Sequence, residues 1–270
     1  FISPNDQFFC SGHLEVAERK FHCWKRAGHG SIDLQNSLEQ SCDVYYYNLA
    51  LKVGIEKITA MANRFGLGER HDIPMSAVAK GLTPTKLWKN RTYGSDWVIG
   101  DTVNASIGQG YLLASPLQLC VMVARLASGN LVIPRLIKNI DGIEQPIPET
   151  TRLGMNENNL QTIRRAMFKV VNDRRGTAYG SRIIGDAMRM AGKTGTSQVR
   201  NITAAERARG VSRNEDLPWE RRDHALFVNF APYDNPKYAV AVVVEHGGGG
   251  STAAAPIARD ITLQALYGGE

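Results

Sequence analysis

The string Lys193-Thr194-Gly195-Thr196 places a cation, two hydroxyls and a glycine on four consecutive residues. A lysine ammonium stabilises a carboxylate or a developing negative charge, and threonine hydroxyls donate hydrogen bonds to the same group. A glycine inside a strand often marks a place where another group approaches the backbone closely. Lys-Thr-Gly is a short match that chance produces often, so an ordinary strand end is the competing interpretation.

A second string, Ser41-Cys42-Asp43, lies far upstream between two segments whose apolar residues have helical spacing. Lys-Thr-Gly, Ser-x-x-Lys and Ser-Asp-Asn together mark enzymes that act through a nucleophilic serine. The middle motif reads Ser-x-Asp in this chain, which replaces an amide donor by a carboxylate acceptor. Covalent catalysis by a serine needs a base beside the nucleophile and donors for the developing oxyanion.

Further strings extend the match over nearly the whole chain. They occupy residues 28–30 (Gly-His-Gly), 41–47, 97–101, 106–111, 115–119, 192–196 and 245–251. In these strings the chain resembles the transpeptidase domain of class B penicillin-binding proteins, and most of all the branch that serves cell elongation. The resemblance implies a mixed α and β transpeptidase fold of the penicillin-binding protein and β-lactamase type, with an antiparallel sheet packed between helices.

The resemblance also implies an activity and roles for single residues. The activity is that of a D,D-transpeptidase, which cross-links peptidoglycan stem peptides through an acyl-serine intermediate and is a target of β-lactams. Catalysis is assigned to Ser41 in the proton relay, Asp43 in orienting the relay or the substrate, and Lys193 as the cation beside the substrate carboxylate. Substrate binding is assigned to Thr194, Gly195 and Thr196, and the backbone N–H of Thr196 is expected to form half of the oxyanion hole.

The catalytic Ser-x-x-Lys string does not occur in the sequence. The nearest approach, from Ser76 to Lys80, has one residue too many. In the family this string should fall just upstream of Phe1. We therefore expect residues 1–270 to be the C-terminal part of a transpeptidase domain that lacks its nucleophile, and the isolated chain to be inactive toward penicillin.

Three of the four cysteines and one histidine gather near the N-terminus, as Cys10, Cys23, His29 and Cys42. Thiolates and imidazole are ligands that zinc prefers, and three cysteines with one histidine complete a tetrahedral structural site. A disulfide with one cysteine left over, or unpaired thiols in the core, are the alternatives. Because some members of the resembling family hold zinc through the equivalents of His29 and Cys42, we expect these four residues to bind a structural zinc ion that pins the catalytic loop.

Composition sets the remaining limits. A hydrophobic fraction of 43% with 21% charged residues is typical of an ordered globular protein. The longest apolar run, residues 238–244, is far shorter than the roughly 20 residues of a membrane-spanning helix. The net charge of +6 suits carboxylate-ended peptides, whereas the absence of a basic stripe interleaved with aromatic residues argues against nucleic acid.

Apolar periodicity and turn residues predict the elements that hold these strings. Helices are expected over 33–53, 55–65, 116–128, 157–171 and 253–266, and strands over 188–199, 225–231 and 238–245. The last two strands, joined by a short turn, should be antiparallel neighbours. Helices followed by an antiparallel sheet and a covering helix indicate one mixed α and β domain.

The resemblance implies partners and a location as well. Stem peptides and β-lactams are the expected ligands, and a lipid-linked glycan polymerase and scaffold proteins of the elongation complex are the expected protein partners. The expected location is the periplasmic face of the inner membrane, through an anchor outside this chain. Two alternatives stay open: a β-lactamase or β-lactam sensor of the same superfamily, and a non-enzymatic, zinc-bearing binding module.

Overall fold

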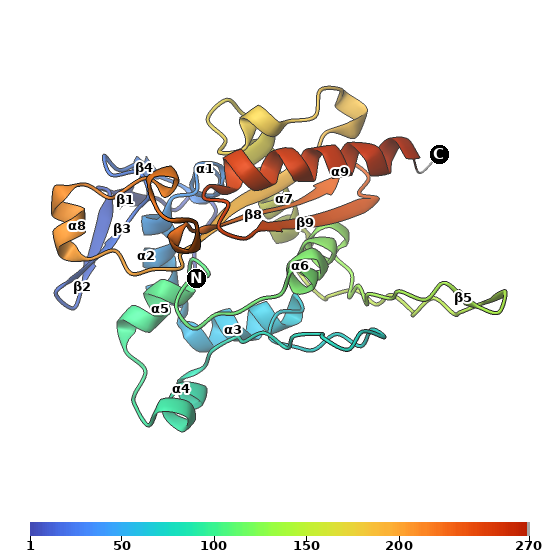
Figure 1. Cartoon of the computed structure of the whole chain (residues 1–270), viewed down its shortest axis with the longest axis horizontal. Coiled ribbons are helices and arrows are strands. Elements are labelled where there is room, and N and C mark those ends of the chain that lie inside the picture. The colour runs from blue at the N-terminus through green and yellow to red at the C-terminus, as the bar shows by residue number, and fades with distance from the viewer. Residues whose placement is uncertain (269–270) are drawn as a thin grey trace. The chain divides into compact units, whose positions relative to one another are not determined.

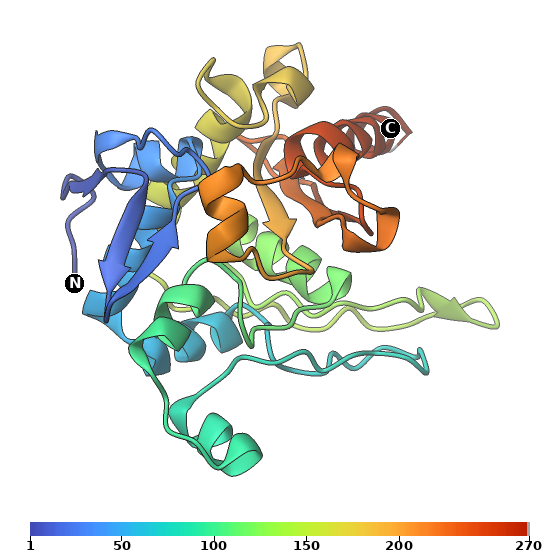
Figure 2. The same cartoon turned by 60° about the vertical axis from the view of Figure 1, so that its left-hand side comes forward.

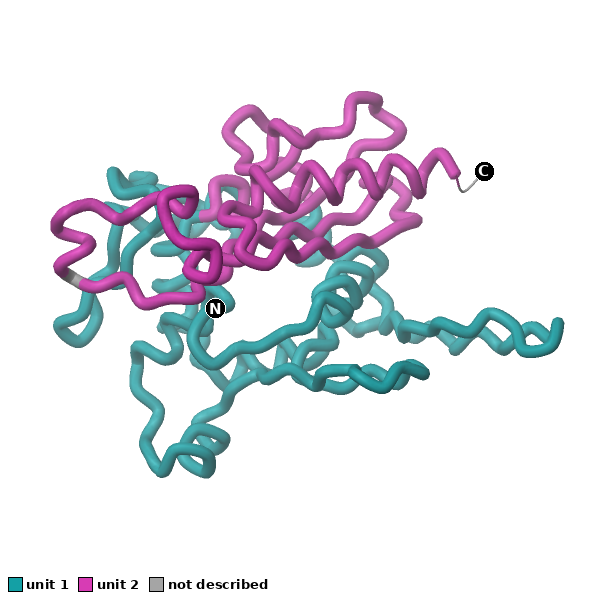
Figure 3. The backbone as a smooth tube through the Cα atoms, in the orientation of Figure 1, with its two compact units in different colours: residues 1–37, 42–164 teal, residues 38–41, 165–270 magenta. Residues whose placement is uncertain are grey.

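The computed structural model describes residues 1–268, which divide into two compact units (Figure 3). Unit 1 comprises Phe1–Ser37 and Cys42–Arg164, and unit 2 comprises Leu38–Ser41 and the chain from Arg165 onward. The short segment Leu38–Ser41 therefore belongs to a different unit from the residues on either side of it. Among the described residues, no helix is both long enough and apolar enough to cross a membrane.

Unit 1 begins with two small antiparallel ribbons and continues with helices. The strands are β1 (Phe8–Cys10), β2 (His13–Val16), β3 (Arg19–His22) and β4 (Gly30–Ile32), and the helices are α2 (Asp43–Val53), α3 (Ile55–Arg64), α4 (Lys86–Tyr93), α5 (Ile99–Ala105) and α6 (Pro116–Ser128). Two further helices, α1 (Leu34–Glu39) and α7 (Glu157–Asn172), begin in unit 1 and end in unit 2. β1 pairs with β4 and β2 pairs with β3. A hairpin of β5 (Asn139–Ile140) and β6 (Ile143–Glu144) extends away from the helices of unit 1 in both views (Figures 1 and 2).

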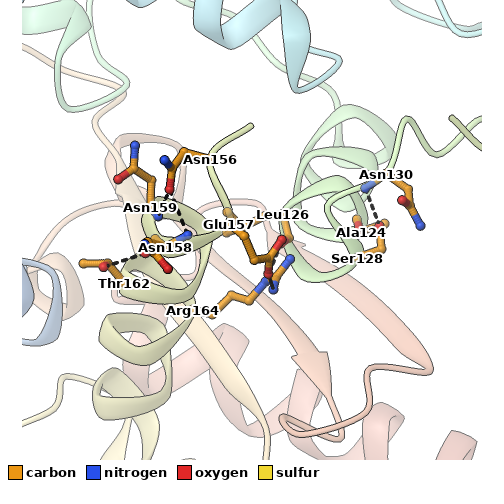
Figure 4. A network of polar contacts seen from close by, with 10 residues as sticks. All are labelled: Ala124, Leu126, Ser128, Asn130, Asn156, Glu157, Asn158, Asn159, Thr162 and Arg164. Carbon is orange, nitrogen blue, oxygen red and sulfur yellow. Dashed lines mark hydrogen bonds and ion pairs between the residues drawn. The ribbon is translucent and has the colours of Figure 1, made fainter. Parts of the chain in front are cut away.

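The start of α6 follows directly from its capping residues, and a side chain of α7 contacts the end of α6. The Ser115 hydroxyl accepts from the N–H of Gln118, and the Gln118 side chain accepts in return from the N–H of Ser115, which forms a capping box around Pro116 at the first helical position. The Arg164 side chain ties α7 to α6, because its Nε donates to the carbonyl of Leu126 at 2.8 Å (Figure 4). The capping box agrees with the start of α6 that the sequence predicts.

Unit 2 is built on a three-stranded antiparallel sheet in the order β7 (Ala191–Ser197), β8 (His224–Ala231) and β9 (Tyr238–Val244). The helix α9 (Ala255–Gly268) lies across β8 and β9 (Figure 1). The core of unit 2 joins Phe227 of β8, small residues at the start of α9 and the valines Val170 and Val171 from the last turns of α7. The long connection between β7 and β8 carries α8 (Ala204–Arg209) and short 3₁₀ turns.

The close approach of Phe227 to β7 explains the first glycine of the Gly-Lys-Thr-Gly string. A Cβ atom on Gly192 would lie 2.5 Å from Phe227 Cζ and 2.7 Å from the carbonyl oxygen of Val228. We expect Gly192→Ala to lower the stability of unit 2 by about 1–3 kcal/mol, since the packed sheet must shift. Thermal unfolding of the full-length protein measures this, with Gly180→Ala as control because a Cβ there meets nothing within 4 Å. Equal losses in the two variants would contradict the packing account.

Candidate active site

Within unit 2, the structure brings Ser41, the first residue of the Ser-x-Asp string, to the Lys-Thr-Gly string. Lys193 Nζ donates to Ser41 Oγ at 2.9 Å and to the carbonyl oxygen of Thr194 at 2.9 Å. The ammonium also lies 3.5 Å from Thr194 Oγ1. A cation that touches one hydroxyl and lies beside a second is able to stabilise an anion or to order a proton relay.

Ser41 reaches Lys193 because of the way α1 ends. The N–H of Ser41 donates to the carbonyl of Leu38 at 3.3 Å, and the N–H of Cys42 donates to the carbonyl of Ser37 at 2.8 Å, which together form a Schellman motif. Ser41 occupies the left-handed position of this motif with φ 55°, where glycine is usual. A serine there costs of order 1–2 kcal/mol, and such strained residues cluster at functional sites.

The strand β7 presents the remaining residues of the string at the edge of the described sheet. Thr194 Oγ1 lies 2.8 Å from Thr177 Oγ1, so this hydroxyl is held in place, whereas the Thr196 side chain is exposed. Gly195 has a packing role too, because a Cβ on Gly250 would lie 2.4 Å from the carbonyl oxygen of Gly195. The turn at Gly250 therefore packs directly on the backbone of β7.

Asp43 is the first residue of α2 in unit 1. Its Oδ2 accepts from the backbone N–H of Trp24 at 2.9 Å. An acidic residue in the first turn also interacts favourably with the helix dipole. The structure thus gives Asp43 a role in fixing the start of α2, and its catalytic role stays a prediction.

Cys10, Cys23, His29 and Cys42, here called the thiol–imidazole cluster, converge in unit 1. Their sulfur and nitrogen atoms all lie within 4.8 Å of one another, and His29 Nδ1 is 3.6 Å from the sulfurs of both Cys10 and Cys23. All three thiols are free and buried in the core that contains Val44, Tyr45 and Tyr47. A hydrogen bond between Cys42 and Cys23 lowers the pKa of Cys23 and raises that of Cys42.

Comparison with known proteins now decides the family. Residues 1–263 match the family model described as the penicillin binding protein transpeptidase domain. The chain belongs to the penicillin-binding protein transpeptidase family. The predicted family, its elongation branch and the predicted fold class are thereby confirmed.

Three relatives illustrate how close the transpeptidase match is. The peptidoglycan D,D-transpeptidase MrdA of Haemophilus influenzae is 36% identical over 269 residues, which cover 96% of this chain and 40% of the relative. The structure of penicillin-binding protein 2 with MreC from Helicobacter pylori has a TM-score of 0.85 and 33% identity, covering 99% of this chain and 46% of that chain. Penicillin-binding protein 2 of Pseudomonas aeruginosa in complex with WCK 5153 has a TM-score of 0.83 and 35% identity, covering 98% of this chain and 56% of that chain.

The family membership corrects one prediction. The expectation of zinc as a cofactor is wrong, because penicillin-binding protein transpeptidases are cofactor-independent and the matches of this chain are of that kind. Proximity of Cys10, Cys23, His29 and Cys42 is not evidence of a bound ion. Cysteine is among the residue types most often buried, so burial in the core of unit 1 accounts for the three thiols.

The burial of Cys42 carries a stability prediction. Its side chain is 0% exposed. We expect Cys42→Ser to lower the stability of unit 1 by about 1–3 kcal/mol, because a hydroxyl is more costly than a thiol to bury without a good partner. The melting temperature of the full-length protein measures this loss. The control is Cys120→Ser, because Cys120 is half-buried in α6. A smaller loss for Cys42→Ser than for Cys120→Ser would refute the role of Cys42 as a core residue.

Sequence reasoning missed four residues beside the Ser41–Lys193 pair: Glu39, Asp173, Arg175 and Thr177. The N–H of Thr177 donates to the carbonyl of Glu39 at 3.2 Å, and Arg175 Nε lies 3.3 Å from Glu39 Oε1. None of the four belongs to a recognised motif. A polar residue in the last turn of a short helix normally indicates an exposed position, so no sequence signal identified Glu39 as buried.

Proposed function

We propose that this chain forms part of the active site of a peptidoglycan D,D-transpeptidase that cross-links stem peptides through an acyl-serine intermediate. The observation that carries the proposal is the 2.9 Å hydrogen bond from Lys193 to Ser41 beside the edge strand β7. The chain spans about two fifths of the MrdA relative, and the printed residues contain no Ser-x-x-Lys string. In this proposal residues 1–270 are the C-terminal part of the domain, and the nucleophilic serine is supplied from outside them.

In the proposed reaction, the nucleophilic hydroxyl attacks the carbonyl carbon of the penultimate D-Ala. The bond to the terminal D-Ala breaks, and the leaving amine takes up a proton. An amine of a neighbouring stem then attacks the acyl-serine, a new amide forms and the serine hydroxyl is restored. Ser41 would pass protons between the nucleophile and the leaving or attacking amine, while the Lys193 ammonium holds the Ser41 oxygen and favours the developing negative charge.

The strand β7 supports the substrate-binding half of the proposal. An extended peptide is able to add to the edge strand of a sheet, and alternate side chains of the strand then meet the ligand. Thr194 and Thr196 would donate hydroxyl hydrogen bonds to the terminal carboxylate, and the N–H of Thr196 would donate to the oxyanion. β-Lactams, which carry a carboxylate beside an acylating carbonyl, would occupy the same strand.

The resemblance to elongation-branch relatives supports the proposed partners and location. A penicillin-binding protein 2 that resembles this chain was solved in complex with MreC. The elongation machinery, including a scaffold protein of this kind and a lipid-linked glycan polymerase, therefore supplies the proposed partners. The proposed place of action is the periplasmic face of the inner membrane, where stem peptides are cross-linked, with the membrane anchor in another part of the protein.

Reaction of the full-length protein with a labelled penicillin tests the proposed function. We expect intact-mass analysis to find one stable adduct, and Lys193→Ala and Ser41→Ala to form it much more slowly. Absence of an adduct, or acylation at the wild-type rate in both variants, would contradict the proposal. Rapid hydrolysis of a chromogenic cephalosporin would favour a β-lactamase of the same superfamily instead.

A further inference from the structure

Glu39 is a buried acid two residues before Ser41 that the proposed reaction does not use. It is the last residue of α1, its side chain is 0% exposed, and neither carboxyl oxygen makes a hydrogen bond of good geometry. Its charged neighbour Arg175 is 58% exposed and places Nε 3.3 Å from Glu39 Oε1. A buried carboxyl group without firm partners is costly, so its retention beside Ser41 calls for an explanation.

Glu39 faces a second acid across the same contact. Arg175 Nε lies 3.5 Å from Asp173 Oδ1, and the backbone N–H of Arg175 donates to that oxygen at 3.0 Å. Burial, and then the neighbouring Asp173, raise the pKa of Glu39, whereas the hydrogen bond from Arg175 lowers the pKa of Asp173. Burial and the nearby Asp173 thus favour the protonated form of Glu39, whereas the contact with Arg175 favours the carboxylate form of Asp173.

The turn that carries these partners is rigid. Gly176 packs against the end of α7, where a Cβ would lie 2.3 Å from the carbonyl oxygen of Val170. The N–H of Ala178 donates to the same carbonyl at 2.9 Å, and the N–H of Gly176 donates to the carbonyl of Asp173 at 2.9 Å. The turn is therefore a fixed support for whatever contacts it.

Two contacts connect this support to the active residues. The backbone N–H of Thr177 donates to the carbonyl of Glu39 at 3.2 Å, and Thr177 Oγ1 lies 2.8 Å from Thr194 Oγ1. The last turn of α1 and the strand β7 are thus both attached to the turn at 173–177. Ser41 lies two residues after Glu39, and Lys193 lies directly before Thr194, so both residues of the Ser41–Lys193 pair are positioned by this turn.

We propose that Glu39 is a positioning residue. As a neutral carboxylic acid, it keeps the end of α1 in contact with the turn at 173–177 and so keeps the Ser41 hydroxyl within hydrogen-bond distance of Lys193. This inference rests on the proposed transpeptidase function, and Glu39 itself touches neither substrate nor nucleophile. Ionisation of Glu39 would place a second negative charge beside Asp173 in a buried site, with Arg175 and Lys169 as the cations that face it. The contact between the end of α1 and the turn at 173–177 would then weaken.

The sign of the pH dependence follows from the raised pKa. In the unfolded chain Glu39 loses its proton near its ordinary pKa of 4.5, whereas the folded protein holds that proton to higher pH. The unfolded state therefore binds fewer protons in this window, and stability falls as the pH rises from the unfolded to the folded pKa. Removing the titration at position 39 should flatten this fall.

The test compares acylation of full-length variants by a fluorescent penicillin across pH 5 to 9, with melting temperatures measured in parallel. Because glutamine mimics the neutral acid, we expect Glu39→Gln to acylate within about threefold of wild type and to lose less activity toward alkaline pH. Glu39→Ala should acylate about 10 to 100-fold more slowly, as displacement of a catalytic group by about 1 Å does. Arg175→Ala, at an exposed position, should fold and acylate within about threefold of wild type, because a neutral Glu39 needs no counter-ion.

The outcomes separate this inference from the proposed function. Glu39→Gln losing as much as Glu39→Ala, or Arg175→Ala losing as much as either, would overturn the neutral-acid account. Wild-type acylation by Glu39→Ala together with a large loss in Lys193→Ala would overturn the positioning role of Glu39 and leave the transpeptidase proposal standing. Wild-type acylation by Lys193→Ala would overturn the proposed function itself.

Discussion

Full-length protein carrying Lys193→Ala is expected to react with a penicillin about 10²–10³-fold more slowly than wild type, the loss typical of removing one preorganised electrostatic group. The reason is local, since Lys193 Nζ donates a hydrogen bond to Ser41 Oγ at 2.9 Å. The second-order acylation rate constant, measured with a fluorescent penicillin, gives the magnitude.

A control separates chemistry from folding in this experiment. Lys237→Ala removes an exposed lysine from the turn before β9 and should leave the acylation rate constant unchanged. The melting temperature of Lys193→Ala should stay close to that of wild type, since the side chain is only half-buried. An acylation rate constant within threefold of wild type for Lys193→Ala would refute the role given to this residue.

Ser41→Gly and Ser41→Ala are expected to separate the hydroxyl from the backbone at the same position. Both remove the relay hydroxyl, so both should lower the acylation rate constant by about 10²–10⁴-fold. They should differ in stability, because Ser41 has φ 55° and glycine adopts this conformation without the steric cost of about 1–2 kcal/mol that alanine retains. Ser41→Gly should therefore melt at a higher temperature than Ser41→Ala.

Ala17→Gly provides the matched control for the backbone effect. Ala17 has φ 47° in the turn between β2 and β3, and its substitution should raise stability without changing the acylation rate constant. If Ser41→Gly melts below Ser41→Ala, the Schellman account of this position is wrong. If either variant at position 41 acylates at the wild-type rate, the Ser41 hydroxyl has no part in the relay.

The motif strings were sufficient to predict the family and the meeting of Ser41 with Lys193. The hydrophobic pattern also located α3, α6, α7, α9, β8 and β9, because these elements are long and rich in apolar residues, whereas β7 was located through the strand that holds the Lys-Thr-Gly string. The ribbons β1 to β4 escaped prediction. Strands of three or four residues with charged and polar members carry too little alternation to detect.

The local details of the candidate site could not be predicted from the sequence, because they depend on tertiary contacts. The apolar spacing predicts helical segments on both sides of Ser41, but it does not predict the Schellman motif that ends α1 and gives Ser41 its left-handed conformation. The position of Glu39 depends on a turn that lies far along the chain, so only tertiary structure reveals its burial. Cys10, Cys23 and Cys42 converge in unit 1, but their spacing in the sequence did not distinguish a ligand set from a disulfide or from core thiols.

A crystal structure of the full-length protein acylated by a penicillin tests the central claim most directly. The quantities to measure are the distances from the drug carboxylate to Thr194 Oγ1 and Thr196 Oγ1, and from the acyl oxygen to the Thr196 nitrogen. The transpeptidase account predicts that the carboxylate lies within about 3.2 Å of at least one threonine hydroxyl, and the acyl oxygen within about 3.2 Å of the Thr196 nitrogen. It also predicts that Lys193 keeps its hydrogen bond to Ser41. An adduct that makes no contact with β7 would contradict the account.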